Sequence, residues 1–336
     1  MIIRDPEYFS RPPEAQRSRH LLLIGLLAIS CWVAALVVMI SLISGTSSPR
    51  SNAHLNKRSA TKAARIAPPV KPFEFPAGGR TLAAGYRFVA LYGSTDMPAL
   101  GALGEQPIAE SVVRCKELAA QYQPLTTEHV YPTLEIISTI ASAQPTDNGD
   151  YSQELDIPKL QPWVAAAREA GVYVVLDLQP GRSDFLSQAK LYEPLLREPH
   201  VGLALDPEWR LGPDQVHLHQ IGTVGIEEVN QTAAWLAELT RANKLPQKLF
   251  LLHQFQLAMI QNREALDTMH PELDYSIQMD GSGSQQAKLD TWNTITQGPP
   301  ANVTFGWKNF YREDQPTLDP AGTMAVTPQP WYVSYQ

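Results

Sequence analysis

The chain has 336 residues and a mass of 37.2 kDa, and its 44% hydrophobic and 18% charged residues exclude a wholly disordered chain and a coiled coil. Its net charge of −7 is unevenly distributed, because residues 1–85 hold 11 Lys and Arg against 4 Asp and Glu, whereas residues 86–336 hold 16 against 30. A C-terminal part this acidic excludes nucleic acid as a partner, since nucleic-acid affinity comes mainly from Lys and Arg that neutralise phosphates.

A long apolar segment follows the N-terminal tail, residues 1–20. Residues 21–44 read LLLIGLLAISCWVAALVVMISLIS, 24 residues without a charge. A helix of this length exceeds the roughly 30 Å hydrocarbon core of a bilayer. The segment is also too long for the apolar part of a cleaved signal peptide, which spans about 7 to 15 residues. We therefore expect an uncleaved, single-pass anchor at residues 21–44, with the lipid bilayer as its partner.

Basic residues flank this segment on both sides, and Arg17 and Arg19 lie closest to it. Because a long domain translocates largely regardless of its own charge, we expect a cytoplasmic N-terminal tail and an extracytoplasmic C-terminal domain at the cell membrane. The near balance of flanking charge leaves the opposite orientation as an alternative. Residues 45–85 combine Pro, Ser, Ala and basic residues with few apolar groups, which is typical of a flexible linker.

From residue 86 to residue 336, short apolar runs alternate with amphipathic stretches, as in βα units around a parallel sheet. Eight runs are candidate strands: 88–92, 134–140, 172–178, 201–205, 249–253, 275–279, 303–307 and 331–335. Clear helices are expected at 158–170 and 227–244. Eight such units in about 250 residues predict an α/β fold, a (β/α)₈ TIM-type barrel, with a doubly wound open sheet as the alternative. The absence of GxGxxG and GxxxxGK[ST] disfavours the nucleotide-binding form of the open sheet.

One further helical stretch carries Ile108, Val112, Cys115 and Ala119 at helical spacing. Cys115 is therefore expected to pack in the core and not to act as a nucleophile. Cys31 is the one other cysteine, so the sequence excludes a disulfide framework and a Cys-rich zinc site.

The active site of a TIM-type barrel lies at the carboxyl ends of its strands. In this sequence those ends are polar or aromatic. The candidate catalytic residues there are Asp177, Asp206, Glu208 and Asp280, and the candidate substrate-binding residues are Tyr92, Gln179, Trp209, Arg210, His253, Gln278, Trp307, Lys308 and Tyr335.

Asp206 and Glu208 are the central pair of this set. Strand side chains alternate, so both point to one face, together with the small residues Gly202 and Ala204 that are expected to fill the barrel below them. Two close carboxylates repel each other's charge, which raises one pKa and keeps one carboxyl group protonated near neutral pH, as a general acid requires. The alternative is structural: these acids form salt bridges to nearby arginines or Lys308 and cap the following helices.

The segment LALDPEW, residues 203–209, resembles the chitinase-like (family 18) glycoside hydrolases and, more loosely, the barrel lysozymes. Both carry Asp-x-Glu at the end of the fourth barrel strand, followed by an aromatic residue. The resemblance implies that Glu208 is the general acid that protonates the glycosidic oxygen, and that Asp206 is its partner.

Gln278-Met279-Asp280 and Trp331 resemble further positions of the chitinase pattern. Two earlier acidic positions of that pattern are Val201 and Ala204 in this sequence. The resemblance therefore implies a carbohydrate-active barrel and not a true chitinase. The domain also resembles the anchored barrel proteins of actinobacterial envelopes, which are of unknown function.

His217 and His219 form a His-x-His pair, and imidazole is a common metal ligand. The pair lies in a loop and lacks a third ligand nearby in sequence, so Asp206 or His253 would have to supply one in space. No Gly-x-Ser-x-Gly elbow is present. We therefore expect no metal ion, no cofactor and no serine nucleophile.

Together these observations predict a membrane-anchored, extracytoplasmic, glycoside-hydrolase-like barrel that acts on an envelope polysaccharide or glycoconjugate. Glu208 would be the acid/base and Asp206 its partner, with Asp177, His253 and Asp280 in support. Aromatic residues at the strand ends suit this function, since sugar rings stack on aromatic faces. The alternative is a catalytically silent barrel that binds a glycan or a protein of the envelope.

Overall fold

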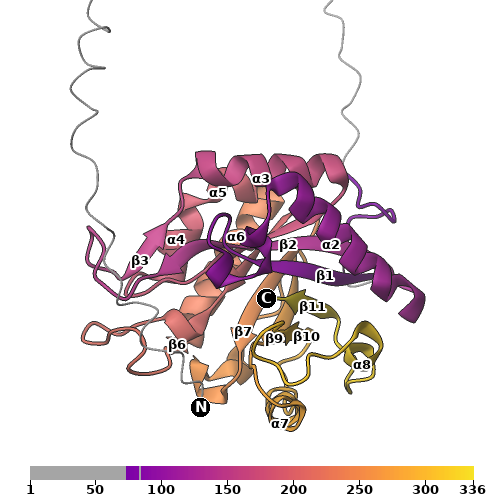
Figure 1. Cartoon of the computed structure of the whole chain (residues 1–336). Helices are drawn as coiled ribbons and strands as arrows, with labels where there is room; N and C mark the ends of the chain where they lie inside the picture. The colour runs from indigo at the N-terminus through magenta and orange to yellow at the C-terminus, as the bar shows by residue number, and fades with distance from the viewer. Residues whose placement is uncertain (1–72, 83–84) are drawn as a thin grey trace, which may run out of the picture. The chain divides into compact units, whose positions relative to one another are not determined.

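The structure, a computed structural model, describes residues 73–82 and 85–336. Within them, eight parallel strands form a closed ring, in which β1 pairs with β2 on one side and with β11 on the other (Figure 1). A closed, eight-stranded parallel barrel of the α/β class is therefore confirmed, and the open-sheet alternative is wrong.

All eight expected strands are present in the ring. They are β1 (Tyr86–Gly93), β2 (His129–Ala141), β4 (Tyr173–Leu178), β5 (Val201–Leu205), β7 (Lys248–Gln254), β9 (Leu273–Met279), β10 (Val303–Asn309) and β11 (Tyr332–Tyr335). Three short strands were not expected: β3 (Ser152–Glu154), which is antiparallel to β2, and β6 (Val224–Gly225) and β8 (Ile260–Gln261), which pair with each other.

Helices cover the outside of the ring (Figure 1). They are α2 (Ile108–Tyr122), α3 (Ile157–Ala170), α4 (Phe185–Leu191), α5 (Glu193–Leu196), α6 (Ile226–Ala242), α7 (Gln285–Ile295) and α8 (Pro320–Met324). Short 3₁₀ turns lie at Pro98–Leu100, Ala102–Glu105, Gln123–Leu125, Pro207–Trp209, Leu257–Met259 and Arg263–Ala265. The last two replace a helix in the connection from β7 to β9.

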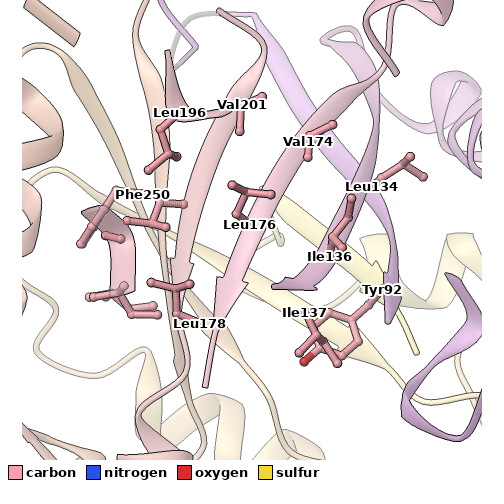
Figure 2. Close-up of a cluster of buried hydrophobic side chains, with 14 of the residues drawn as sticks. Tyr92, Leu134, Ile136, Ile137, Val174, Leu176, Leu178, Leu196, Val201 and Phe250 are labelled. Carbon is pink, nitrogen blue, oxygen red and sulfur yellow. The ribbon is translucent and has the colours of Figure 1, made fainter. Parts of the chain in front are cut away.

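Both faces of the strands are buried, which explains why they read as nearly continuous apolar runs. Leu134 and Ile136 of β2, and Val174 and Leu176 of β4, belong to the cluster that packs under the surrounding helices (Figure 2). The alternate residues point into the barrel, so polar residues at those positions are enclosed by the ring.

Aromatic rings fill the amino end of the barrel interior. Phe88 stacks on Tyr131 with 5.7 Å between ring centroids, and Tyr131 meets Tyr173 edge-on at 5.5 Å. Phe75 and Leu82 belong to the same buried cluster. Part of the expected linker, residues 73–82, therefore packs against this end of the barrel, because it carries apolar side chains within an otherwise polar stretch.

The α2 stripe is buried as predicted, with Val112, Cys115 and Ala119 facing inward. The Cys115 thiol donates a hydrogen bond to the Thr133 carbonyl oxygen at 3.0 Å, and burial raises the pKa of this thiol to about 12. Cys115 is therefore a core residue, and its thiolate form is strongly disfavoured.

The expected anchor at residues 21–44, the tail before it and most of the linker lie outside the described residues. Among the helices of residues 73–82 and 85–336, none has both the length and the apolar composition needed to cross a bilayer. The membrane anchor and the orientation stay predictions.

Candidate functional site

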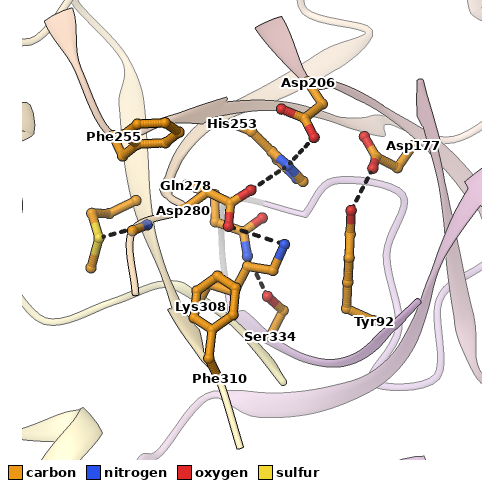
Figure 3. Close-up of polar contacts among 12 residues, drawn as sticks. Tyr92, Asp177, Asp206, His253, Phe255, Gln278, Asp280, Lys308, Phe310 and Ser334 are labelled. Atoms are coloured by element: carbon orange, nitrogen blue, oxygen red, sulfur yellow. Dashed lines mark hydrogen bonds and ion pairs between the residues drawn. The ribbon is translucent and has the colours of Figure 1, made fainter. Parts of the chain in front are cut away.

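Polar side chains fill the carboxyl half of the barrel interior (Figure 3). They are Tyr92 of β1, Glu135 of β2, Asp177 of β4, Asp206 after β5, His253 of β7, Gln278 of β9, Asp280 after β9, Lys308 of β10, and Tyr332 and Ser334 of β11. Each is at most 8% exposed. We call these ten residues the mouth cluster.

Small residues make room for larger side chains inside the barrel. A Cβ atom on Gly202 would lie 2.6 Å from the Leu249 carbonyl oxygen, and one on Gly306 would lie 3.1 Å from the Cβ atom of Tyr332. Ala204 is buried in the interior next to these positions. The small residues of β5 and β10 therefore let larger side chains of the other strands meet inside the ring, as side-chain alternation predicts.

His253 lies at the centre of the mouth cluster. Its Nε2 atom is 2.8 Å from Oε1 of Glu135, whose Oε2 atom accepts a hydrogen bond from the Tyr332 hydroxyl at 3.0 Å. Its Nδ1 atom lies 3.1 Å from Asp280 Oδ2 and 3.7 Å from Asp206 Oδ2. Both are ion-pair contacts and neither meets the geometric criteria of a hydrogen bond. Asp177 and the other surrounding carboxylates outweigh the opposing effect of burial and raise the pKa of His253.

Asp280 and Lys308 form a buried ion pair, with Oδ1 and Nζ 3.1 Å apart. Burial alone would raise the pKa of Asp280, but Lys308 and His253 outweigh it and hold this pKa at about 2. Lys308 Nζ also lies 3.4 Å from the centroid of the Tyr92 ring. The salt-bridge alternative therefore applies to Asp280, which is an ionised carboxylate inside the barrel.

Asp177 is in a different environment. Its Oδ2 atom accepts a hydrogen bond from the Tyr92 hydroxyl at 3.0 Å, while its buried Oδ1 atom has no hydrogen-bond partner in the described part of the chain. Burial raises the pKa of Asp177 to about 8, against an opposing effect of His253 and with a further rise caused by Asp206. The pKa of Asp177 is thus raised while that of Asp280 is lowered, and such a separation between nearby carboxyl groups is typical of acid/base enzymes.

The side chains of Asp206 and Glu208 lie close together, although Glu208 is not on a strand as expected. The chain leaves β5 in the 3₁₀ turn Pro207–Trp209, yet carboxylate oxygens of Asp206, Glu208 and Asp280 all lie within 4.8 Å of one another. Asp206 is 1% exposed, whereas Glu208 is partly exposed. Glu208 therefore connects the buried carboxylates with the surface of the mouth.

A returning loop holds the backbone of this turn. The Gly222 amide donates a hydrogen bond to the Glu208 carbonyl oxygen at 2.7 Å. A Cβ atom on Gly222 would lie 2.5 Å from each of the carbonyl oxygens of Pro207, Glu208 and Arg210. Glycine is thus required at position 222 for the loop to approach the turn that carries Glu208.

Three expected substrate-binding residues lie beside the mouth cluster. The side-chain oxygen of Gln179 accepts a hydrogen bond from a backbone amide at the end of β2, at 3.0 Å. Arg210 forms a 3.1 Å ion pair with Glu228. The Trp209 ring meets His217 edge-on, with 5.3 Å between centroids. Gln179 and Arg210 therefore connect loops to one another, and Trp209 belongs to the wall of the mouth.

Trp307 and Tyr335 point out of the barrel, because their sequence neighbours in β10 and β11 point in. Trp307 packs edge-on against Trp292 of α7 at 5.6 Å and donates a hydrogen bond to Asn309 at 2.9 Å. The hydroxyl of Tyr335 lies 2.5 Å from that of Tyr122 in α2. The structure therefore separates both residues from the mouth cluster, while it brings together Tyr92, Asp177, Asp206, Glu208, His253, Gln278, Asp280 and Lys308.

The candidate set from the sequence lacks Glu135, Tyr332 and Ser334. Glu135 lies within the apolar run of β2, well before the strand ends, and Ser334 forms a short hydrogen bond with Gln278 from within β11. An acidic residue in the middle of an apolar strand was the available signal for Glu135, because such a residue needs a buried partner.

Two groups of ligand-type side chains form in the described residues: Asp177 with Asp206 and His253, and Asp206 with Glu208 and Asp280. The His-x-His pair belongs to neither group. His217 is buried, with Nε2 3.1 Å from the Tyr151 carbonyl oxygen, and His219 is exposed.

No protein-family model and no curated protein matches the sequence. Among solved structures, the chain is similar to that of CcCel6C, a glycoside hydrolase family 6 enzyme from Coprinopsis cinerea, with 13% sequence identity and a TM-score of 0.28. The alignment covers 66% of this chain and 60% of that enzyme, so the chain matches less than two thirds of the enzyme's length. The function is therefore inferred from the chemistry of the mouth.

Proposed function

We propose that this protein is a carbohydrate-active hydrolase of the cell envelope that cleaves a glycosidic bond in a polysaccharide or glycoconjugate by acid/base catalysis. The observation that carries the proposal is the convergence of Asp206, Glu208 and Asp280 oxygens within 4.8 Å at the carboxyl ends of β5 and β9. Active sites of such barrels lie at this end. Glycosidic cleavage needs one carboxyl group to protonate the leaving oxygen and a second to assist.

Glu208 is the acid/base in this proposal. It is partly exposed, whereas Asp206 and Asp280 are buried, so Glu208 is the carboxyl group that a bound glycan meets first. Asp206 lies next to it as its partner. Asp280 is kept ionised by Lys308 and adds negative charge beside the bond that is cleaved, which favours a transition state of oxocarbenium character.

An aromatic wall beside Glu208 supports a sugar substrate. Trp209 meets His217 at 5.3 Å, Tyr151 meets His217 at 6.3 Å, and the guanidinium carbon of Arg182 lies 4.5 Å over the Tyr151 ring. Ligand sites combine such apolar faces with a few fixed polar groups. Arg182 covers one face of Tyr151 and His217 is buried, so in this proposal the partly exposed Trp209 is the ring on which a sugar stacks, and Glu208 supplies the proton.

The envelope location rests on the uncharged segment at residues 21–44. In this proposal the segment anchors the chain in the bilayer and the barrel lies outside the cytoplasm, where envelope glycans are its partners. Protease added to intact cells is expected to remove the barrel. Full protection, with digestion only after lysis, would place the barrel in the cytoplasm.

The hydrolysis test uses the detergent-solubilised full chain, incubated with fractionated envelope polysaccharides, and measures new reducing ends. Glu208→Gln is expected to lower the rate at least about 100-fold, since it removes the proton donor but keeps the shape of the side chain. The matched control is Glu227→Gln, an exposed acid in the first turn of α6. An unchanged rate in Glu208→Gln contradicts the assignment.

A binding barrel without catalysis is the second candidate. The observation that favours it is the near-complete burial of Asp177 and Asp206, which leaves Glu208 as the accessible acid among the carboxylates near the mouth. It predicts saturable glycan binding that survives Glu208→Gln, is lost in Trp209→Ala, and is accompanied by no turnover of any fraction.

A further inference from the structure

The mouth cluster contains more negative than positive groups. Glu135, Asp177, Asp206 and Asp280 are all buried within it, and Lys308 is its one lysine. Lys308 pairs directly with Asp280. His253 is the other group of the cluster that can carry positive charge, and it lies 2.8 Å from Glu135. The four acids outnumber these two cationic groups, so the cluster can accept a further cation.

Three buried atoms around this position lack hydrogen-bond partners among the described residues: Asp177 Oδ1, Asp206 Oδ1 and His253 Nδ1. Asp177 and Asp206 each offer a carboxylate oxygen, and His253 a ring nitrogen, within 4.8 Å of one another. Figure 3 shows both carboxylates next to the imidazole. Most buried polar atoms have a partner, so three exceptions on three neighbouring side chains indicate room for a further ligand among them.

The groups behind these residues orient them as metal ligands. Glu135 accepts a hydrogen bond from Nε2 of His253, and Nδ1 faces Asp206 and Asp280. Asp177 and the other carboxylates outweigh the effect of burial and raise the pKa of His253, so an ion bound at Nδ1 would take the place of a proton. The Tyr92 hydroxyl occupies the other oxygen of Asp177. A metal-binding histidine almost always donates its second N–H to a carboxylate or carbonyl group, and metal-binding carboxylates are themselves hydrogen-bonded.

We propose that Asp177, Asp206 and His253 bind one divalent transition-metal ion, such as Mn²⁺ or Zn²⁺, inside the barrel mouth. One imidazole nitrogen and two carboxylate oxygens suit these ions better than Ca²⁺ or Mg²⁺, which prefer oxygen ligands alone. Three protein ligands leave room for a bound water. Asp206 also belongs to the group that contains Glu208, so these ligands lie next to a partly exposed side chain.

This inference is independent of the proposed function, because it follows from the buried groups and not from any substrate. It differs from the sequence expectation of no metal ion, since the three ligands come from strands that lie far apart in the sequence and share no motif.

The test is ion binding by the full chain, stripped with a chelator and then titrated separately with MnCl₂, followed by the electron paramagnetic resonance signal of free Mn²⁺, and with ZnCl₂, followed by calorimetry. One ion per chain is expected. Asp177→Asn and His253→Gln are each expected to weaken binding more than about 10-fold, and Tyr332→Phe less strongly, because it only loosens Glu135.

The matched control is Asp274→Asn. Asp274 is a buried acid with an unpartnered oxygen on β9, but it lies outside both ligand-type groups. Its substitution is expected to leave ion affinity unchanged. Thermal unfolding with and without Mn²⁺ provides a second readout: the wild type and Asp274→Asn should melt at higher temperature with the ion, and Asp177→Asn should not.

Absence of binding by the wild type up to about 1 mM of either ion overturns the proposal, as does equal binding by Asp177→Asn and His253→Gln. If these variants fail to fold, the graded effects of Tyr92→Phe and Tyr332→Phe on ion affinity decide in their place. Glu208→Gln separates the two proposals, since it is expected to bind the ion normally while losing hydrolysis.

Discussion

The two halves of the barrel interior are built from the same strands with opposite chemistry. In β2 the inward residue Tyr131 is followed four positions later by Glu135, and in β4 Tyr173 is followed four positions later by Asp177. The amino half is a packed aromatic layer, whereas the carboxyl half holds charges that depend on one another. The difference shows how one ring of strands separates the residues that stabilise the fold from those available for chemistry.

The largest expected effect comes from opening the aromatic half. Phe88→Ala should lower the free energy of unfolding by about 3–5 kcal/mol, because the ring is fully buried against Tyr131, Tyr173 and Trp331. Urea denaturation measures this loss. Phe88→Leu is the control and should cost much less. If Phe88→Ala lowers the free energy of unfolding by no more than a surface substitution does, the amino half of the barrel interior is not tightly packed.

The next effect concerns the charged half. Lys308→Met removes the lysine that lies 3.1 Å from buried Asp280, leaves only His253 beside this carboxylate, and should cost roughly 3 kcal/mol. Adding Asp280→Asn should restore part of this stability, since the double variant no longer buries the unpaired charge. Equal stability of the single and double variants in urea would show that the two side chains are not coupled.

A third prediction concerns Lys248, a charge at the amino end of β7. Its Nζ atom donates hydrogen bonds to the carbonyl oxygens of Glu198 and Val201 at 2.9 and 2.7 Å, and burial lowers its pKa to about 7. Between this value and the ordinary lysine pKa the unfolded chain binds more protons. The stability should therefore rise with pH from about 7 upward, by up to about 1.4 kcal/mol per pH unit.

Lys248→Met is the reference for this measurement, because it removes the titrating group. Urea unfolding at pH 7, 8 and 9 should show a growing stability of the wild type relative to this variant. A difference that does not change with pH would mean that Lys248 stays charged in the folded chain.

The smallest effect separates the mouth cluster from the outer layer. Tyr335→Phe should cost about 1 kcal/mol, because it removes the hydroxyl that pairs with Tyr122. Hydrolysis and ion binding should be unaffected, since Tyr335 points away from the mouth. If hydrolysis or ion binding is lost while the stability is unchanged, Tyr335 takes part in the site.

The strands were predictable because burial on both faces makes them continuous apolar runs, and their number favoured the barrel. The strands β6 and β8 were not, since two residues leave no periodicity to read. The packing of residues 73–82 was hidden for a related reason: Phe75 and Leu82 are isolated apolar residues in a stretch of linker-like composition.

The site was predictable only in part, because the strand-end rule ignores side-chain direction. It selected Lys308 together with Trp307, although adjacent residues of a strand must point to opposite faces. It passed over Glu135, which reaches the same interior from within a strand. Combining strand ends with alternation would have removed Trp307 and admitted Glu135, whereas the meeting of His253 with acids of three other strands required the closed ring.

The packing of Phe75 has a mechanical consequence. A pull on the chain at residue 73 reaches this ring, set 5.7 Å from Tyr86 and 6.1 Å from Tyr131, before it reaches any strand of the ring. We therefore expect the first event under load to be the withdrawal of the Phe75 side chain from the aromatic cluster at the amino end of the barrel. We therefore expect tension to be resisted first at the amino end of the barrel, away from the mouth cluster.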